Sequence, residues 1–482
     1  MTQDMLKFVS VDRQMPEKRD ADLRKQDFHE IYADFIDEKA REQSSRCSQC
    51  GVPFCQQGCP LGNNIPDWLM LVAENRLEEA YEISSATNNM PEICGRICPQ
   101  DRLCEGICTV EQSGHGTVTI GAVERYITDT AWEKGWVTPI KPPREKDQSV
   151  GIIGAGPAGF AAAEQLRAKG YQVTIYDRYD RAGGLLIYGI PGFKLEKEIV
   201  TRRTQRLVDS GVEFSYGADV GNNISLAELR EKHDSLLIAT GVYNARALEL
   251  PGVAGATGVY KALDYLTTSN RCDLGDKVEA FESGELDAKG KRVVVVGGGD
   301  TAMDCVRTAI RQGAKSVTCM YRRDRANMPG SQREVMNAEE EGVTFDWLSA
   351  PRAVLTKKTG EVKAVKAQRM RLGLPDMSGR RSPEPVEGSE YDLKADIVIE
   401  ALGFEPEDLP QLFGESALTV NRWGAVKVDH RTMMTSIDGV FAAGDIVRGA
   451  SLVVWAVKEG RDAAIGIDRY LKAAARMVTA AE

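Results

Sequence analysis

The stretch SVGIIGAGPAGFAAAEQLRAKGYQVTIYD, residues 149–177, decides the fold of this chain. A short apolar run, VGIIG, leads into the glycine-rich turn GAGPAG, and a helix-forming segment and a second apolar run follow. The spacing of Gly154, Gly156 and Gly159 is the G-x-G-x-x-G signature of dinucleotide binding when it joins a strand to a helix. The segment therefore predicts a strand, a tight turn, a helix and a second, parallel strand.

Each glycine of this turn has its own role. The first permits the tight turn, the second lets the backbone approach a pyrophosphate at the helix N-terminus, and the third lets helix and strand pack closely. Asp177 ends the second strand, where an acid accepts hydrogen bonds from the ribose hydroxyls of a dinucleotide. With strand, helix and acid in register, a turn that binds no ligand is the weaker interpretation.

Residues 291–323, KRVVVVGGGDTAMDCVRTAIRQGAKSVTCMYRR, repeat the same plan. Ala302 stands at the third glycine position, which is a tolerated variant. The second strand of this repeat ends in Arg322 and Arg323 instead of an acid. A carboxylate would repel the 2′-phosphate of NADPH, whereas a guanidinium fork suits it, so the sequence predicts NADPH in preference to NADH. The candidate NADPH-binding residues are Gly297, Gly299, Asp300, Thr301, Ala302, Arg322 and Arg323.

Three further segments indicate that the first unit binds FAD: residues 181–194, 235–241 and 439–464. Each of them ends or follows a strand with a turn of small residues. Together they resemble the flavoproteins with two dinucleotide-binding domains, the glutathione- and thioredoxin-reductase group. That resemblance implies that Asp445 meets the ribityl–phosphate part of FAD, and that the next helix directs its N-terminus at the flavin ring. The candidate FAD-binding residues are Gly154, Gly156, Pro157, Ala158, Gly159, Asp177, Arg178, Gly183, Gly184, Leu185, Gly189, Ile190, Pro191, Thr240, Gly241, Gly444 and Asp445.

Hydride transfer between a nicotinamide and a flavin requires no acid–base side chain. It requires the two rings to stack at roughly 3–3.5 Å with water excluded. We therefore nominate no catalytic residue. His115 and His233 have no partner pattern that suggests one, and we interpret both as surface or core histidines.

Length and charge set the class of protein. The 482 residues exceed one ordinary hydrophobic core and predict several domains. A formal net charge of −10 argues against nucleic acid or an anionic membrane as a partner. The N-terminus lacks a signal-peptide pattern, and no run reaches the roughly 18 apolar residues of a membrane span. We expect a cytoplasmic protein, in which clustered cysteines are more often metal ligands than disulfides.

The predicted fold class is α/β, with two Rossmann-like dinucleotide-binding domains of the glutathione-reductase type preceded by an α-helical iron–sulfur domain. The polar segment KPPREKDQS, residues 141–149, marks the first boundary. We expect a helical domain at 1–145, an FAD-binding domain formed by 146–280 and 430–482, and an NADPH-binding domain at 281–429. Within the first domain, apolar residues at helical spacing predict one amphipathic helix across residues 21–45.

Eight of the eleven cysteines lie in two short bursts, residues 46–60 and 93–108. A zinc ribbon would show two C-x-x-C pairs, and only Cys47 and Cys50 fit that spacing. A disulfide framework conflicts with the expected compartment, and the C-x-x-C-H of haem attachment is absent. Short, irregular thiolate spacings suit iron–sulfur clusters, and eight cysteines suffice nominally for two four-iron clusters.

The motifs then become specific in combination. The pattern C-x2-C-x4-C-x3-C, then C-x3-C-P-x4-C-x3-C, then GAGPAG, YGIPGFKL and VVVVGGGDTAMDC resembles the small (β) subunits of bacterial NADPH-dependent glutamate synthases over essentially the whole chain. The module is also similar to the N-terminal half of dihydropyrimidine dehydrogenase and to a subunit of ferredoxin:NADP transhydrogenases. A complete dihydropyrimidine dehydrogenase would need a further barrel domain and more cysteines.

The resemblance implies two cross-threaded 4Fe-4S clusters. The first takes Cys47, Cys50 and Cys55 from one burst and Cys108 from the other. The second takes Cys59, Cys98 and Cys104, and its fourth ligand is either Glu124 or Cys94, of which we prefer Glu124. Glu124 stands where dihydropyrimidine dehydrogenase has a glutamine ligand, and an oxygen ligand should change the cluster's potential.

The family resemblance implies an electron-input subunit. NADPH gives hydride to FAD, and electrons pass singly through the clusters to a large (α) FMN-containing subunit that makes L-glutamate from L-glutamine and 2-oxoglutarate. We therefore expect a hetero-oligomer. Two alternatives stay open: a subunit of an NADPH/ferredoxin transhydrogenase, and a non-catalytic scaffold that holds the clusters.

Overall fold

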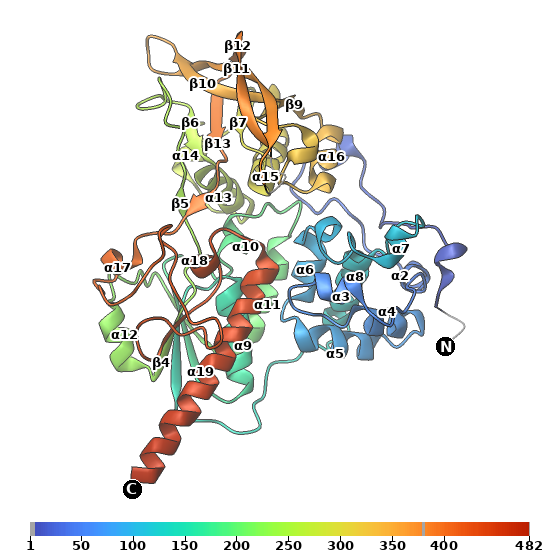
Figure 1. Cartoon of the computed structure of the whole chain (residues 1–482), viewed down its shortest axis with the longest axis vertical. Helices are drawn as coiled ribbons and strands as arrows, with labels where there is room; N and C mark the ends of the chain where they lie inside the picture. The colour runs from blue at the N-terminus through green and yellow to red at the C-terminus, as the bar shows by residue number, and fades with distance from the viewer. Residues whose placement is uncertain (1–4, 378–380, 482) are drawn as a thin grey trace.

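The computed structural model describes residues 5–377 and 381–481, which form a helical N-terminal domain and two α/β units (Figure 1). The helical domain packs around Trp68, which is fully buried among apolar side chains of α2, α4, α5 and α8. Its elements are η1 (Lys7–Val9), α1 (Ala21–Arg24), α2 (Asp37–Ser44), α3 (Phe54–Gly58), α4 (Ile65–Ala73), α5 (Leu77–Thr87), α6 (Pro91–Ile97), η2 (Gln100–Arg102), α7 (Thr109–Gln112) and α8 (Ile120–Glu133).

The first α/β unit contains a parallel sheet of strand order β15-β4-β1-β2-β3. Because helices cover a parallel sheet on both faces, its strands are apolar along their length, and four of the five residues of β1 are buried. The elements are β1 (Ser149–Ile153), α9 (Pro157–Ala168), β2 (Gln172–Asp177), α10 (Leu185–Tyr188), α11 (Lys197–Asp209), β3 (Glu213–Tyr216), α12 (Leu226–Lys232), β4 (Ser235–Ile238), α17 (Leu409–Leu412), β15 (Val440–Ala442), α18 (Asp445–Arg448) and α19 (Val453–Ala481).

The second unit repeats this wiring, with strand order β6-β13-β7-β8-β9 and every pairing parallel. In each unit the strand before the glycine turn lies at the centre, and the strand after the turn's helix lies beside it. The elements are β6 (Val259–Lys261), α13 (Ala262–Asp273), α14 (Glu279–Glu282), β7 (Arg292–Val296), α15 (Asp300–Arg311), β8 (Ser316–Tyr321), η3 (Arg325–Asn327), α16 (Gln332–Glu340), β9 (Thr344–Trp347) and β13 (Ile397–Glu400). The predicted fold class is confirmed.

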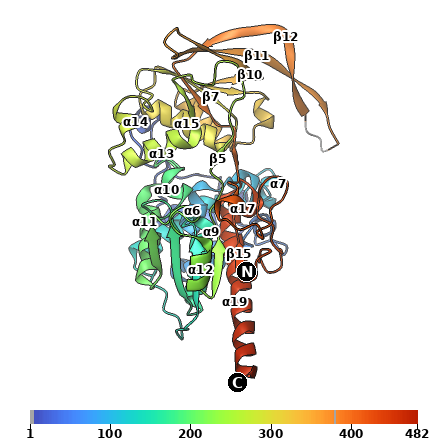
Figure 2. The same ribbon diagram turned by 90° about the vertical axis from the view of Figure 1, so that its left-hand side faces the viewer.

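Two smaller sheets complete the molecule. The long strands β10 (Ser349–Thr356), β11 (Val362–Pro375) and β12 (Arg381–Lys394) form an antiparallel sheet that projects from the second unit (Figure 2). The short strands β5 (Asn244–Ala245) and β14 (Phe404–Glu405) pair where the chain crosses between the two units.

Two groups of elements join a different sheet or core from the one expected of the domain to which the sequence analysis assigned them. Strand β6 and helix α13, which we expected in the FAD-binding domain, belong to the second sheet and its core. Helix α17, which we expected in the NADPH-binding domain, packs its Leu409 in the same core as Ile153 of the first unit. We therefore propose that the units exchange near residues 245 and 405.

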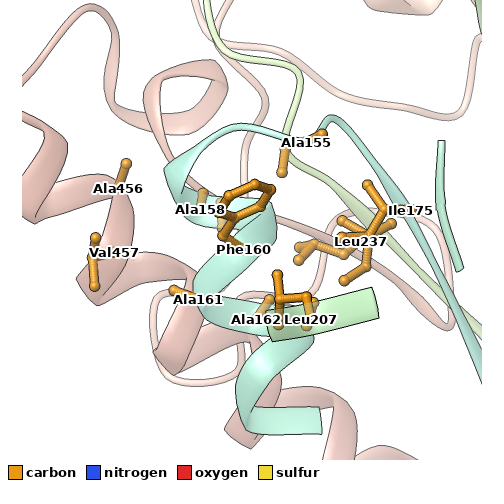
Figure 3. Packing of buried hydrophobic residues seen from close by; sticks show 14 of the residues in the cluster. Ala155, Ala158, Phe160, Ala161, Ala162, Ile175, Leu207, Leu237, Ala456 and Val457 are labelled. Carbon is orange, nitrogen blue, oxygen red and sulfur yellow. The ribbon is translucent and has the colours of Figure 1, made fainter. Parts of the chain in front are cut away.

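Helix α9 fills the space between the first sheet and the C-terminal helix α19. Phe160 and Ala162 lie toward Ile175 and Leu237 of the sheet, and Ala158 and Ala161 lie toward Ala456 and Val457 (Figure 3). The two helices approach so closely that a Cβ on Gly460 would stand 2.2 Å from the Ala158 carbonyl oxygen. This contact fixes the start of α19 beside the glycine turn.

Candidate functional sites

The first glycine turn has the geometry that a dinucleotide requires. Gly154 has φ of +112°, and a Cβ there would lie 2.3 Å from the Ala239 carbonyl oxygen. A Cβ on Gly159 would lie 2.1 Å from the Gly154 carbonyl oxygen. By contrast, a Cβ on Gly156 would meet no atom within 4 Å. The turn is therefore packed against the protein on one side and open beside Gly156, where the pyrophosphate of a ligand would approach.

Asp177 closes the turn from the end of β2. Its carboxylate accepts hydrogen bonds from the backbone N–H groups of Ala155 at 2.7 Å and Tyr179 at 2.8 Å. Burial raises the pKa of Asp177, and these two N–H groups and Arg178 oppose the shift. A pocket beyond it is lined by Arg178, Tyr243 and Thr240, among others. Arg178 is held by Glu407 at 2.9 and 3.0 Å.

The other predicted FAD residues converge on the same turn. The N–H of Gly183 donates to the Ala155 carbonyl oxygen at 2.9 Å, and a Cβ on Gly184 would lie 3.0 Å from the Cα of Gly156. Leu185, Gly189, Ile190 and Pro191 follow on α10 and its C-terminal turn, and Pro157 and Ala158 begin α9.

The remaining predicted FAD-binding residues follow the ends of β4 and β15. The hydroxyl of Thr240 is buried and has no hydrogen-bond partner, and Gly241 follows it. A Cβ on Gly444 would lie 3.0 Å from the Cβ of Ala158. Burial and, to a smaller degree, Glu459 raise the pKa of Asp445 to about 7. A buried hydroxyl without a partner and a carboxyl that burial keeps partly protonated fit a site that a polar ligand completes.

The second unit carries a cavity of about 860 Å³ over its glycine turn. Gly297, Gly299 and Thr301 line it together with Arg322 and Arg323. A Cβ on Gly299 would meet no atom within 4 Å, as at Gly156. Ala302 is fully buried behind the turn, and Asp300 accepts a hydrogen bond from the Ser331 N–H at 2.9 Å. These two predicted residues therefore support the turn from the protein side.

The arginine pair lies at the cavity edge where the 2′-phosphate is expected. The Nε of Arg323 is buried and has no hydrogen-bond partner, so its guanidinium retains a free donor. Sequence reasoning missed Arg246, which lines the same cavity from the crossing between the units and is held by Glu405 at 2.8 Å. Glu249 is the acidic residue of this lining.

The cysteines of the two bursts divide between two cavities of the helical domain. Cys47, Cys50, Cys55 and Cys108 line one, which we call cavity A. Cys59, Cys94, Cys98, Cys104 and Glu124 line the other, which we call cavity B. Ile120, the first residue of α8, lines both. Each cavity thus draws thiols from both bursts, in the cross-threaded grouping that the family resemblance implied.

The thiols surround the cavities without being close enough to share one ion. Among residues 5–377 and 381–481, no three His, Cys, Asp or Glu side chains form a site for a single metal ion. All eight thiols are free of disulfides. Burial raises the pKa of Cys47 and Cys59 to about 11 and that of Cys55 to about 12. Buried and half-buried thiols spaced around a common cavity fit a polynuclear iron–sulfur group better than zinc.

Neighbouring side chains that the sequence analysis did not single out contact these candidate ligands. In cavity A, Ser48 and Thr109 place their hydroxyls 3.0 and 2.9 Å from the Cys50 sulfur. In cavity B, the side-chain amides of Asn63 and Asn88 donate to Oε1 of Glu124 at 3.0 and 3.1 Å. No sequence signal marks these residues, because their role depends on the packing of separate helices.

Cavity B adjoins the first α/β unit. Val454, in the first turn of α19, lines cavity B and packs with Cys94 and Cys98. The buried pair of Glu92 and Arg203, at 2.6 and 2.8 Å, joins α6 to α11 at the same junction. Cavity A lies toward the surface, where Phe54, one of its lining residues, is 43% exposed.

Comparisons with known proteins agree with this division of the chain. Residues 24–136 match the family described as dihydropyrimidine dehydrogenase domain II, 4Fe-4S cluster, and residues 148–460 match the pyridine nucleotide-disulphide oxidoreductases. The glutamate synthase [NADPH] small chain of Azospirillum brasilense is 65% identical over 475 residues, 98% of each chain. The protein of the same name from Escherichia coli (strain K12) is 46% identical over 98% of this chain and 100% of its own.

The solved structures show the fold alone. FprA of Mycobacterium tuberculosis in complex with NADPH superposes with a TM-score of 0.58 at 19% identity, over 69% of this chain and 86% of FprA. Among the helices that the structure describes, none combines the length and apolar character needed to cross a membrane.

Proposed function

Because this chain belongs to the family of glutamate synthase [NADPH] small chains, we propose that it is the electron-input subunit of a glutamate synthase. Its second unit binds NADPH and its first unit binds FAD. Bound FAD would accept two electrons from NADPH as hydride and release them one at a time. Two 4Fe-4S clusters would carry these single electrons out of the subunit. A large FMN-containing subunit would use them to make L-glutamate from L-glutamine and 2-oxoglutarate.

The observation that carries this proposal is the order of the sites. The cavity over the second glycine turn faces the crossing between the units, and Val454 connects the start of α19 to cavity B. Ile120 then separates cavity B from cavity A, and cavity A reaches the surface at Phe54. This series supports electron flow from NADPH through the flavin and both clusters to a partner.

We propose that cavity A holds its cluster through Cys47, Cys50, Cys55 and Cys108, and cavity B through Cys59, Cys98, Cys104 and Glu124. The carboxylate of Glu124 is preferred to Cys94 because two amides already hold its Oε1 atom, which leaves Oε2 for iron. Cys94 instead lies 3.7 Å from the side-chain oxygen of Asn88, to which its thiol donates.

The large subunit is proposed to cover the surface beside cavity A. Val52 and Phe54, in the first cysteine burst, are 55% and 43% exposed, although both are large and apolar. Apolar side chains exposed next to the outermost cluster are typical of a contact that forms only in a complex. The free thiols require a reducing compartment, so we place this complex in the cytoplasm.

The test is to purify the chain with the proteins that bind it and to measure NADPH oxidation. We expect a large FMN-containing subunit to copurify, and NADPH oxidation by the complex to depend on both L-glutamine and 2-oxoglutarate. Oxidation that depends on ferredoxin and ignores both substrates would identify a transhydrogenase subunit instead. A chain that cannot reduce an artificial electron acceptor with NADPH would be a scaffold.

A further inference from the structure

Arg46 is a fully buried cation that forms no ion pair with a carboxylate of the described residues. Its Nε donates to the carbonyl oxygen of Val11 at 2.9 Å. Its two terminal nitrogens donate to the carbonyl oxygens of Thr117, His115 and Gly116. Within residues 5–377 and 381–481, its guanidinium forms hydrogen bonds to these backbone carbonyls and no ion pair.

The other deeply buried arginines are neutralised. Arg24 bonds to Glu341 at 2.9 Å and to Glu340 at 2.7 Å. Arg307 bonds to the same Glu341 at 2.8 and 2.9 Å and to Glu334 at 2.6 Å. Burying a charge is costly unless an opposite charge accompanies it, and carbonyl dipoles satisfy hydrogen bonds without cancelling the charge. Among the described residues, Arg46 is thus not directly paired with an opposite charge, unlike Arg24 and Arg307.

Arg46 does not itself line cavity A, but its chain neighbour Cys47 does. Arg46 is bonded directly to Cys47, and the carbonyls that it binds precede Val118 and Ile120, which line the same cavity as Cys108. Burial and, to a smaller degree, Arg13 lower the pKa of Arg46, and Cys108, Asp12 and Glu111 are the acidic groups that oppose this shift.

We propose that the cluster of cavity A is the counter-charge of Arg46, and that Arg46 raises the reduction potential of this cluster above that of the cluster in cavity B. The proposal rests on the proposed function, because it requires both clusters. Four thiolates make a cluster anionic, and each one-electron reduction adds a negative charge, which a buried cation stabilises. The electron comes from NADPH through FAD and leaves to the partner, and no bond at Arg46 forms or breaks.

Whereas Arg46 precedes Cys47 of cavity A in the chain, no cysteine of cavity B has a basic chain neighbour. The lining of cavity B contains neutral side chains, thiols and the carboxylate of Glu124. Arg96, on the helix between Cys94 and Cys98, is already paired with Glu30 and Asp129, at 2.7 Å each. The hydroxyls of Ser48 and Thr109 beside Cys50 should further raise the reduction potential of the cavity A cluster above that of the cavity B cluster, because hydrogen bonds to cluster sulfurs raise the potential. The inner cluster therefore has the lower potential, and electrons move outward downhill.

The test is a redox titration of the full-length chain loaded with FAD and both clusters, followed by electron paramagnetic resonance. The signal of the cavity A cluster is identified as the one altered by Cys50→Ser. We expect Arg46→Gln to lower the midpoint potential of this signal so that the ratio of reduced to oxidised cluster falls at least tenfold, about 59 mV for one electron. Arg46→Lys keeps the charge and should preserve most of the native potential. Arg24→Gln is the matched control, because it removes a buried arginine far from both cavities and should leave both potentials unchanged.

An unchanged potential in Arg46→Gln, with full iron content, would overturn the proposal. If Arg46→Gln does not assemble the cluster, the proposal is tested by the midpoint potential of Arg46→Lys and by which of the two wild-type clusters has the higher potential. A native cavity A signal with the lower of the two potentials would also refute the inference. Failure of the proposed function looks different, because the wild-type chain would then lack iron for two clusters or would not be reduced by NADPH.

Discussion

At the scale of single residues, we predict that Arg322 and Arg323 determine the choice of nicotinamide cofactor. Replacing both by glutamine should raise the Michaelis constant for NADPH while leaving that for NADH nearly unchanged. A hydrogen bond to a charged group contributes about 1.5–3 kcal/mol, so the loss per arginine should be about tenfold or more. Steady-state kinetics with both nucleotides measure this. Arg325→Gln is the control, because Arg325 pairs with Glu339 at 2.9 Å and lies outside the cavity lining. Equal effects on NADPH and NADH would contradict the assignment.

Glu124 and Cys94 are the two candidates for the fourth ligand of the cluster proposed in cavity B. If Glu124 is the fourth ligand, Glu124→Ala should lose the cavity B cluster or change its electron paramagnetic resonance signal. Cys94→Ala should keep both clusters, because its thiol would only line the cavity. Iron content and the spectrum of each purified variant separate these results. The opposite pattern, in which Cys94→Ala loses iron and Glu124→Ala does not, would make Cys94 the ligand.

At the scale of elements, the pair of Glu92 and Arg203 fixes helix α6 against α11. Both side chains are buried, and the charge of Arg203 keeps the pKa of Glu92 low despite its burial. Removing one partner of a buried ion pair costs about 3–5 kcal/mol, because the other charge is left unpaired. We expect Glu92→Gln to lower the thermal unfolding midpoint and to slow reduction of the clusters more than reduction of FAD. Glu79→Gln, which breaks an exposed pair with Arg76 in the same domain, should leave both unchanged.

The segment 21–45 shows how tertiary contacts override a local pattern. We predicted one amphipathic helix, but the structure has the short helices α1 and α2 with an irregular segment between them. Helix α1 and the irregular segment after it contact the other two units. Arg24, the last residue of α1, bonds to Glu341 of the second unit. The ring centroid of Phe28, in the irregular segment, lies 6.3 Å from that of Phe193 in the first unit. A continuous helix could not make both contacts, so the prediction was wrong for a reason that lies outside the segment.

At the scale of the whole molecule, the network around Glu341 makes the packing of the N-terminal segment depend on pH. Burial raises the pKa of Glu341, but hydrogen bonds and charges of Arg307 and Arg311 outweigh it and bring the pKa to about 2, from 4.5. A lowered carboxyl pKa stabilises the folded state above the unfolded pKa, and this contribution is lost as the pH falls toward 2. Its size is on the order of 3 kcal/mol. The thermal midpoint of the wild-type chain should therefore converge on that of Glu341→Gln as pH falls from 5 toward 3; parallel curves would contradict this.

The surface beside cavity A should be needed only in the complex. Val52→Ser and Phe54→Ser together should weaken binding of the large subunit at least tenfold, because exposed apolar side chains at a contact contribute through their burial. NADPH-dependent reduction of an artificial acceptor by the isolated chain should not change. Sedimentation of the mixed subunits measures the first result. Exposed Leu374 on β11 offers the matched control, since Leu374→Ser removes an apolar side chain from another part of the surface. Unchanged binding in the double variant would place the interface elsewhere.

The sequence by itself determined the two dinucleotide-binding units and the two cysteine bursts that supply the candidate cluster ligands. Both features are local in the sequence. The glycine turn and the cysteine bursts can each be recognised from the spacing of a few residues along the chain. Only the tertiary structure showed that Ile120 lines two cavities, that β6 joins the second sheet and α17 the first core, and that the buried Arg46 forms no ion pair among the described residues. These features depend on contacts between charges, strands and helices from distant parts of the chain. The spacing of residues within one segment does not predict such contacts.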